Sequence, residues 1–272
     1  MKKLFLLFNS MLFSIICLTS CLEGNNETTG QALGVFSAYG GKNFNPVFIS
    51  NVGNVYSPNM SSLMEDERCY FITYKFQSDL PENSAAMVAA NGYATVTILD
   101  RQELDSYPLM SYRSDTSTVL LDETPLISGY VSGGISYVPG YLFLQHSVRQ
   151  ASDARLDWEM SYDYSTTPTI ESGMRYYDVF LRATIKVEGT KSAEDVSYLN
   201  AYHVDNFLTN AAYNEKAYLE NSGSYNANSS KFTLRINYVS AINDTQITWT
   251  RSSVDLNIYT FILSSEGSYL SK

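Results

Sequence analysis

The sequence is poor in the residues that most enzymes and metal sites require. Its 272 residues include only two histidines and three cysteines. It has no Gly-x-Ser-x-Gly segment to present a serine nucleophile, and no Gly-x-x-x-x-Gly-Lys-Ser/Thr loop to bind phosphates. Paired histidines or a Cys-x-x-Cys segment would indicate zinc, and neither is present. The sequence therefore predicts no catalytic residue, no metal site and no cofactor.

Each histidine has an ordinary interpretation and a chemical one. His146 shares the apolar face of a predicted strand with Leu142, Leu144 and Val148, which indicates a hydrogen-bonded core residue. His203 is two positions before Asp205, so the two side chains would lie on one face of a strand, as an orienting pair for a nucleophile would. The pattern leaves a chemical role for His203–Asp205 open. It does not supply the nucleophile.

Acidic residues outnumber basic ones, and no basic cluster exceeds two residues. The formal net charge of −10 becomes −12 (−10 − 2) once residues 1–20, with their two lysines, are removed. Phosphate backbones bind basic surfaces, so this charge argues against nucleic acid as a partner. The acidic groups Glu65–Glu67 and Asp153–Asp163 could bind calcium, but neither has the loop spacing that this ion favours. Solvated acidic faces are the simpler interpretation.

The one long apolar run is at the start of the chain. Lys2-Lys3 precedes Leu4 to Leu18, and Leu18-Thr19-Ser20 leads directly to Cys21. A basic start, a short apolar stretch and a small-residue cleavage site are the three parts of an export signal. A cysteine at this position predicts a lipoprotein, acylated on Cys21 and cut before it. Residues 1–20 would be the signal peptide, and the lipid would hold the protein on a membrane.

Processing would leave one thiol. Cys17 is removed with the signal and Cys21 carries the lipid, so only Cys69 remains and no internal disulfide can form. We expect Cys69 to be a small buried residue at a strand start.

The mature chain of 252 residues (272 − 20) is dominated by alternation of apolar and polar residues, which is typical of half-buried antiparallel strands. The clearest runs are 70–77, 93–98, 142–148, 156–162, 175–188, 231–238 and 254–258. Helix is expected only at 84–90, before Asn91-Gly92, and at 208–220, with Thr209 as a possible cap. The fold class is therefore all-β.

Composition divides the chain further. Residues 21–35 are rich in Gly, Asn and Thr and suggest a flexible tether. The strand pattern breaks between Asp105 and Asp115. We accordingly expect a first β domain at 36–108 and a second at 112–272.

The segments Gly53–Pro58 and Glu67–Tyr74, followed by a strand ending at Leu99-Asp100, resemble the N-terminal domain of the NigD-like lipoproteins of Bacteroidetes. A second region of likeness includes Asp122–Ile127, Pro139–Leu142, and the strands at 156–162 and 178–185. The resemblance implies a small OB-like barrel followed by an antiparallel β-sandwich, and it carries over no catalytic residue. Residues 201–228 look like additional material.

Three functions remain open after these exclusions. The first is a lipid-anchored, non-enzymatic protein of the cell envelope, placed on the outer membrane, which binds an envelope protein or assembles with one. The second is a glycan-binding or glycan-degrading surface lipoprotein, because the 22 tyrosines could stack on sugar rings. The third is a structural subunit of a surface assembly. The aromatic residues whose exposure would distinguish them are Phe71, Trp158, Tyr162, Tyr176 and Tyr177.

Overall fold

A computed structural model describes residues 26–112, 115–130, 134–163, 167–244 and 246–265. The chain divides between Ser106 and Tyr107 into two compact units, and Ser136–Val138 group with the first. The predicted signal peptide and Cys21 lie outside the described residues. Within them, no helix is both long and apolar enough to span a bilayer.

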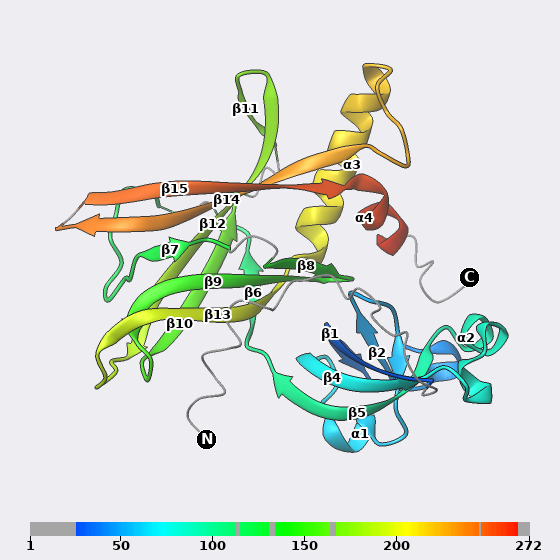
Figure 1. The fold of residues 1–272 in the computed structure, drawn as a ribbon. Helices are drawn as coiled ribbons and strands as arrows, with labels where there is room; N and C mark the ends of the chain where they lie inside the picture. The colour runs from blue at the N-terminus through cyan, green and yellow to red at the C-terminus, as the bar shows by residue number, and fades with distance from the viewer. Residues whose placement is uncertain (1–25, 113–114, 131–133, 164–166, 245, 266–272) are drawn as a thin grey trace. The chain divides into compact units, whose positions relative to one another are not determined.

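The first unit is a closed five-stranded barrel (Figure 1). Its strands are β1 (Glu27–Ser37), β2 (Val47–Ser50), β3 (Val55–Tyr56), β4 (Cys69–Gln77) and β5 (Ala94–Glu103), and its short helices are η2 (Lys42–Phe44), α1 (Met60–Leu63), η3 (Pro81–Asn83) and α2 (Ala85–Asn91). Around the barrel the strands follow the order β1-β2-β3-β5-β4. The core includes Phe36, Phe48 and Ile72, and α1 adds the fully buried Met60. This small closed barrel confirms the predicted OB-like fold.

The predicted tether at 21–35 is wrong beyond residue 26, because β1 begins at Glu27. Glycine suggested a linker here, but the glycines serve close packing. A Cβ added at Gly30 would lie 2.6 Å from the ring of Tyr74, and at Gly34 it would meet the carbonyl oxygen of Ile49. A strand that bends through a closed barrel needs glycine where another chain segment approaches it. The barrel consequently starts before residue 36.

The second unit is built on one large sheet. Its strands are β6 (Ser106–Met110), β7 (Leu126–Ser128), β9 (Tyr141–Ala151), β10 (Arg155–Tyr162), β11 (Thr169–Glu171), β12 (Met174–Val187), β13 (Ala193–His203), β14 (Lys231–Asn243) and β15 (Gln246–Asn257); β8 is Ile135–Val138, and the helices are α3 (Asp205–Asn221) and α4 (Ile258–Ser265). The order is β15-β14-β12-β10-β6-β13-β9-β7, with β11 beside β12. The sheet curls until β7 lies against β14, and α3 packs beside α4 and β14 (Figure 1).

Two of the described strand pairs in the second unit depart from the antiparallel pattern. β10 runs parallel to β6, and β12 runs parallel to β14. Parallel neighbours require a long connection, and β13 with α3 provides one between β12 and β14. Alternation of residues reports which face is buried but not the direction of the neighbouring strand. The continuous sheet therefore contains two pairings that the sequence did not indicate.

The predicted strands and helices are otherwise present. On β12 the apolar face predicted from alternation is buried at Tyr177, Val179, Leu181 and Ala183. α2 ends at Asn91, and Gly92 after it has a φ of +78°, the left-handed conformation that terminates helices. α3 begins earlier than predicted, so Thr209 lies inside the helix and is not its cap.

His146 is a core residue, as the sequence predicted. Its ring is fully buried and stacks on Trp158 at 4.7 Å between centroids. Nδ1 lies 2.5 Å from the carbonyl oxygen of Gly129, and Nε2 lies 2.9 Å from the hydroxyl of Tyr202. Burial disfavours the charged ring and lowers the pKa of His146 to about 4, although the bond to Gly129 opposes the shift.

We expect the free energy of unfolding to fall as pH drops from about 6.5 to about 4. The unfolded chain takes up a proton near pH 6.5 and the native chain only near pH 4, so acid favours the unfolded state within that window. The slope is at most about 1.4 kcal/mol per pH unit. Urea unfolding at several pH values measures it, and His146→Gln should remove the slope. Equal stability of the wild type at pH 6.5 and pH 4.5 would contradict the assignment.

Candidate functional site

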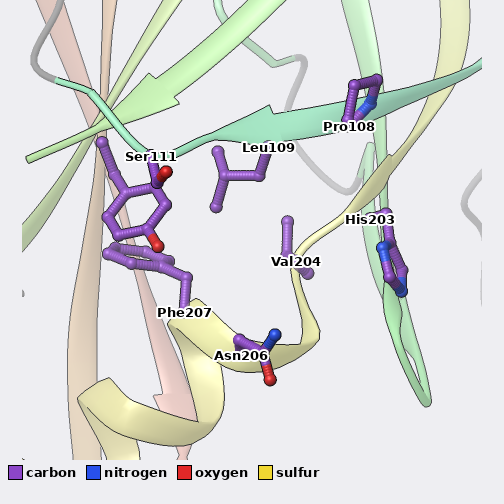
Figure 2. A pocket seen from close by; sticks show the side chains of 8 residues that line it. Pro108, Leu109, Ser111, His203, Val204, Asn206 and Phe207 are labelled. Carbon is purple, nitrogen blue, oxygen red and sulfur yellow. The ribbon is translucent and has the colours of Figure 1, made fainter. Parts of the chain in front are cut away.

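A small cavity in the second unit is formed where β6, β10 and the start of α3 meet (Figure 2). Its volume is about 240 Å³. The lining residues are Pro108, Leu109, Ser111, Tyr162, His203, Val204, Asn206 and Phe207. The rings of Tyr162 and Phe207 pack at 4.6 Å and make one wall. The cavity thus combines an apolar wall with four polar side chains, a composition suited to a small amphipathic group.

The polar side chains of the cavity do not form a nucleophile–base pair. In Figure 2, Ser111 and His203 stand apart, with Leu109 and Val204 between them. The ring of His203 is exposed and packs on Tyr141 at 5.2 Å between centroids. General-base catalysis needs the imidazole within hydrogen-bond reach of the hydroxyl. The arrangement supports binding better than acyl transfer.

The predicted His203–Asp205 face is wrong. β13 ends at His203, and Asp205 is the first residue of α3. The change from strand to helix removes the two-residue alternation on which the prediction depended. The side chain of Asp205 is outside the described part of the structure.

Cys69 is buried, as predicted. Burial raises the pKa of its thiol to about 12, so the reactive thiolate is scarce at neutral pH.

No group of three or more His, Cys, Asp or Glu side chains among the described residues could hold a metal ion. In one acidic group, Asp66 accepts a bond from the backbone of Ala38 at 2.7 Å. In the other, Asp153 accepts bonds from Thr190, which lower its pKa to about 2.

The aromatic residues proposed as sugar platforms are only partly accessible. Trp158 and Tyr177 are buried, at 5% and 1% exposure. Phe71, Tyr162 and Tyr176 are half-buried. The ring of Trp158 stacks on His146 in the core, so it is not available to stack on a sugar.

A buried ion pair lies on the face of β12 that alternation assigned to solvent. The side chains of Arg182 and Glu123 are 3% and 0% exposed. Their two parallel bonds measure 2.6 and 2.7 Å, and Arg182 also donates to the carbonyls of Asp115 and Thr118. This pair fixes the segment before β7 on the sheet. A charged residue that alternates with apolar ones predicts an exposed side chain. The sequence therefore did not indicate that Arg182 forms a buried ion pair.

A second ionic cluster joins β11, β12 and β14. Arg235 contacts both carboxylate oxygens of Asp178, at 2.5 and 2.8 Å, and Glu171 at 2.8 Å. Asn237 donates to Asp178 at 2.7 Å. Burial alone would raise the pKa of Asp178, but the bonds from Arg235 and Asn237 lower it below its usual range. The guanidinium of Arg235 and both carboxylate oxygens of Asp178 have partners, which indicates a structural role.

A family model matches the barrel. Residues 24–102 match the model of a lipoprotein OB domain. This match agrees with the lipoprotein resemblance predicted from the sequence. No curated protein matches the chain.

Solved structures share the fold of most of the chain. An uncharacterised protein from Parabacteroides merdae is 18% identical, with a TM-score of 0.67, and the match covers 84% of this chain and 99% of that one. A lipoprotein from Bacteroides fragilis is 12% identical, with a TM-score of 0.51 and coverage of 85% and 98%. A NigD-like immunity protein from Bacteroides caccae is 12% identical, with a TM-score of 0.42 and coverage of 85% and 94%. At these identities the similarity is one of fold. Together with the OB-domain match, the similarity to the Bacteroides fragilis lipoprotein confirms the predicted resemblance to Bacteroidetes lipoproteins.

Proposed function

We propose that the protein is a lipoprotein of the outer membrane, anchored through acyl chains on Cys21, and that it binds an envelope component without chemical turnover. The observation that carries the proposal is the position of the OB-domain match. The match begins at residue 24, three residues after Cys21, and a complete export signal precedes that cysteine. The matched family is one of lipoprotein domains, which supports a position at the cell envelope.

Three features favour binding over catalysis. His203 and Ser111 stand apart across the cavity, His146 is sealed in the core, and Cys69 is buried with a raised pKa. These groups are the imidazoles and the thiol that a Ser-His or Cys-His mechanism would use. The cavity beside α3 is the binding site that we propose.

The alternatives have less support. Trp158, the ring expected to stack on a sugar, is buried, so a glycan-binding role would have to use other rings such as the exposed Tyr213 and Tyr218. A fibre subunit requires a long apolar edge that accepts a neighbour's strand. β15 is the terminal strand of the sheet, but its exposed side chains include Gln246, Arg251 and Asp255. Charges on an edge strand oppose pairing with another strand.

Photo-crosslinking in living cells tests the proposed site. A photoreactive amino acid replaces Asn206 at the cavity, and in a matched strain it replaces Ala217, which is exposed on the same helix. We expect one defined envelope adduct from position 206 and none from position 217. Equal labelling from both positions would contradict the assignment of the cavity. Hydrolysis of envelope glycans or esters by the purified protein, lost on His203→Ala, would contradict the non-enzymatic role.

A further inference from the structure

Two connections of the barrel lie side by side. The β1–β2 connection, residues 38–46, contains η2, and the β4–β5 connection, residues 78–93, contains η3 and α2. The ammonium of Lys42 donates to the carbonyls of Ala89 at 3.3 Å and Ala90 at 2.9 Å. These bonds hold η2 at the C-terminal end of α2. In small OB barrels the corresponding loops flank the surface that contacts ligands.

Apolar side chains project from both connections into solvent. Tyr39 is 71% exposed, Phe44 is 80% exposed and Met87 is 43% exposed. α2, whose sequence begins Ala-Ala-Met-Val-Ala-Ala, buries none of its residues. We call Tyr39, Phe44 and Ala85–Ala90 the apolar rim. Exposed apolar side chains gathered on two adjoining connections are typical of an interaction surface.

Phe44 is held outward by an unfavourable backbone. Its φ of +58° lies in the left-handed region, which costs a non-glycine residue about 1–2 kcal/mol. The strained residue is also one of the most exposed aromatic side chains of the barrel. Strain that presents an apolar side chain to water is better explained by a contact that it makes than by the fold itself.

The first described residue after the predicted anchor, Asn26, is hydrogen-bonded to the β4–β5 connection. The backbone N–H of Ser78, the first residue of the β4–β5 connection, donates to the carbonyl of Asn26 at 2.9 Å. Cys21 is five residues before Asn26 in the sequence. Five residues span at most about 18 Å when fully extended. An acyl chain on Cys21 therefore keeps the base of this connection within about two helix diameters of the bilayer.

We propose that the apolar rim lies in the interfacial layer of the bilayer that holds the lipid of Cys21. The inference rests on the proposed acylation, because the anchor supplies the proximity. Apolar side chains gain free energy by entering the boundary between headgroups and acyl chains, and an anchored domain loses little further freedom when they do so. Asp79 and Glu82 are exposed at the start of the β4–β5 connection and stay in water. Phe44 and Met87 are the residues that enter the lipid.

The experiment uses the full mature chain, coupled through the Cys21 thiol to a maleimide phospholipid in phosphatidylcholine vesicles. Cys69 does not interfere, because its thiol is buried and its pKa is raised to about 12. Phe44→Trp places a fluorophore in the rim. Leu99→Trp is the matched control, since Leu99 is 54% exposed on β5 outside the rim. The wild-type emission of Trp158 and Trp249 is subtracted.

We expect the emission of Phe44→Trp to shift to the blue and to be quenched when the acyl chains are brominated, while Leu99→Trp stays unchanged. Met87→Trp should show the same blue shift and quenching, which would show that the response is not caused by the substitution at position 44 alone. Emission from positions 44 and 87 that matches position 99 would overturn the inference. A blue shift that grows with protein density but does not respond to bromine would also overturn it, because a second copy would then cover the rim. Chemical coupling replaces acylation by the cell, so a failure of acylation in vivo is a separate result that bears on the proposed function.

Discussion

Replacing Glu123 with alanine is expected to lower the free energy of unfolding of the second unit by about 3–5 kcal/mol. The side chain of Glu123 is fully buried and makes two bonds to the buried guanidinium of Arg182. Its removal leaves that charge in the interior without a counter-ion, and the cost of desolvating it is no longer offset. Urea unfolding followed by tryptophan emission measures the change, because Trp249 donates to the carbonyl of Thr116 in the segment that the pair anchors.

An exposed ion pair of the same sheet is the control. Arg149 and Asp195 meet at 2.9 Å on adjacent strands with side chains 68% and 60% exposed. Asp195→Ala should change stability by less than about 1 kcal/mol, because water screens the pair. The double variant Glu123→Leu with Arg182→Met should recover much of the loss, since no charge remains buried. Equal effects of Glu123→Ala and Asp195→Ala would contradict a structural role for the buried pair.

Replacing Cys21 with serine is expected to abolish acylation altogether. The thioether to the lipid needs the Cys21 sulfur, and the cut before residue 21 depends on that lipid. Labelled palmitate in the protein should fall to background, and the uncut precursor should replace the mature band. Cys17→Ser is the matched control: it changes a thiol four residues away, inside the apolar run. We expect it to be acylated and cut as the wild type is. Normal palmitate labelling of Cys21→Ser would exclude this anchor.

The repeating features of the fold could be predicted from the sequence because alternation reports burial directly. The apolar face of β12 and the core position of His146 followed from that period. The position of α2 followed from a helix-stopping Asn91-Gly92. In each case a local pattern is sufficient, since neighbouring residues along one strand or helix determine the outcome.

Features that depend on distant segments were missed. Gly30 and Gly34 suggested a tether, yet the approach of Tyr74 and Ile49 from other strands requires them inside β1. Alternation along β12 predicts an exposed Arg182, because the segment with Glu123 that covers it is some 60 residues away in sequence. The cavity likewise combines β6, β10 and α3, and no spacing in the chain marks that combination. The apolar rim likewise depends on distant segments, because the bond from Lys42 to Ala90 joins the β1–β2 and β4–β5 connections.

Mass spectrometry of the N-terminal peptide, taken from protein extracted from its native membrane, tests the central claim most directly. The claim predicts that the chain begins at Cys21 and that this peptide carries the mass of a diacylglyceryl group, with or without a further acyl chain on its amine. A peptide that begins at Cys21 without lipid, or that continues through residues 1–20, would contradict the claim.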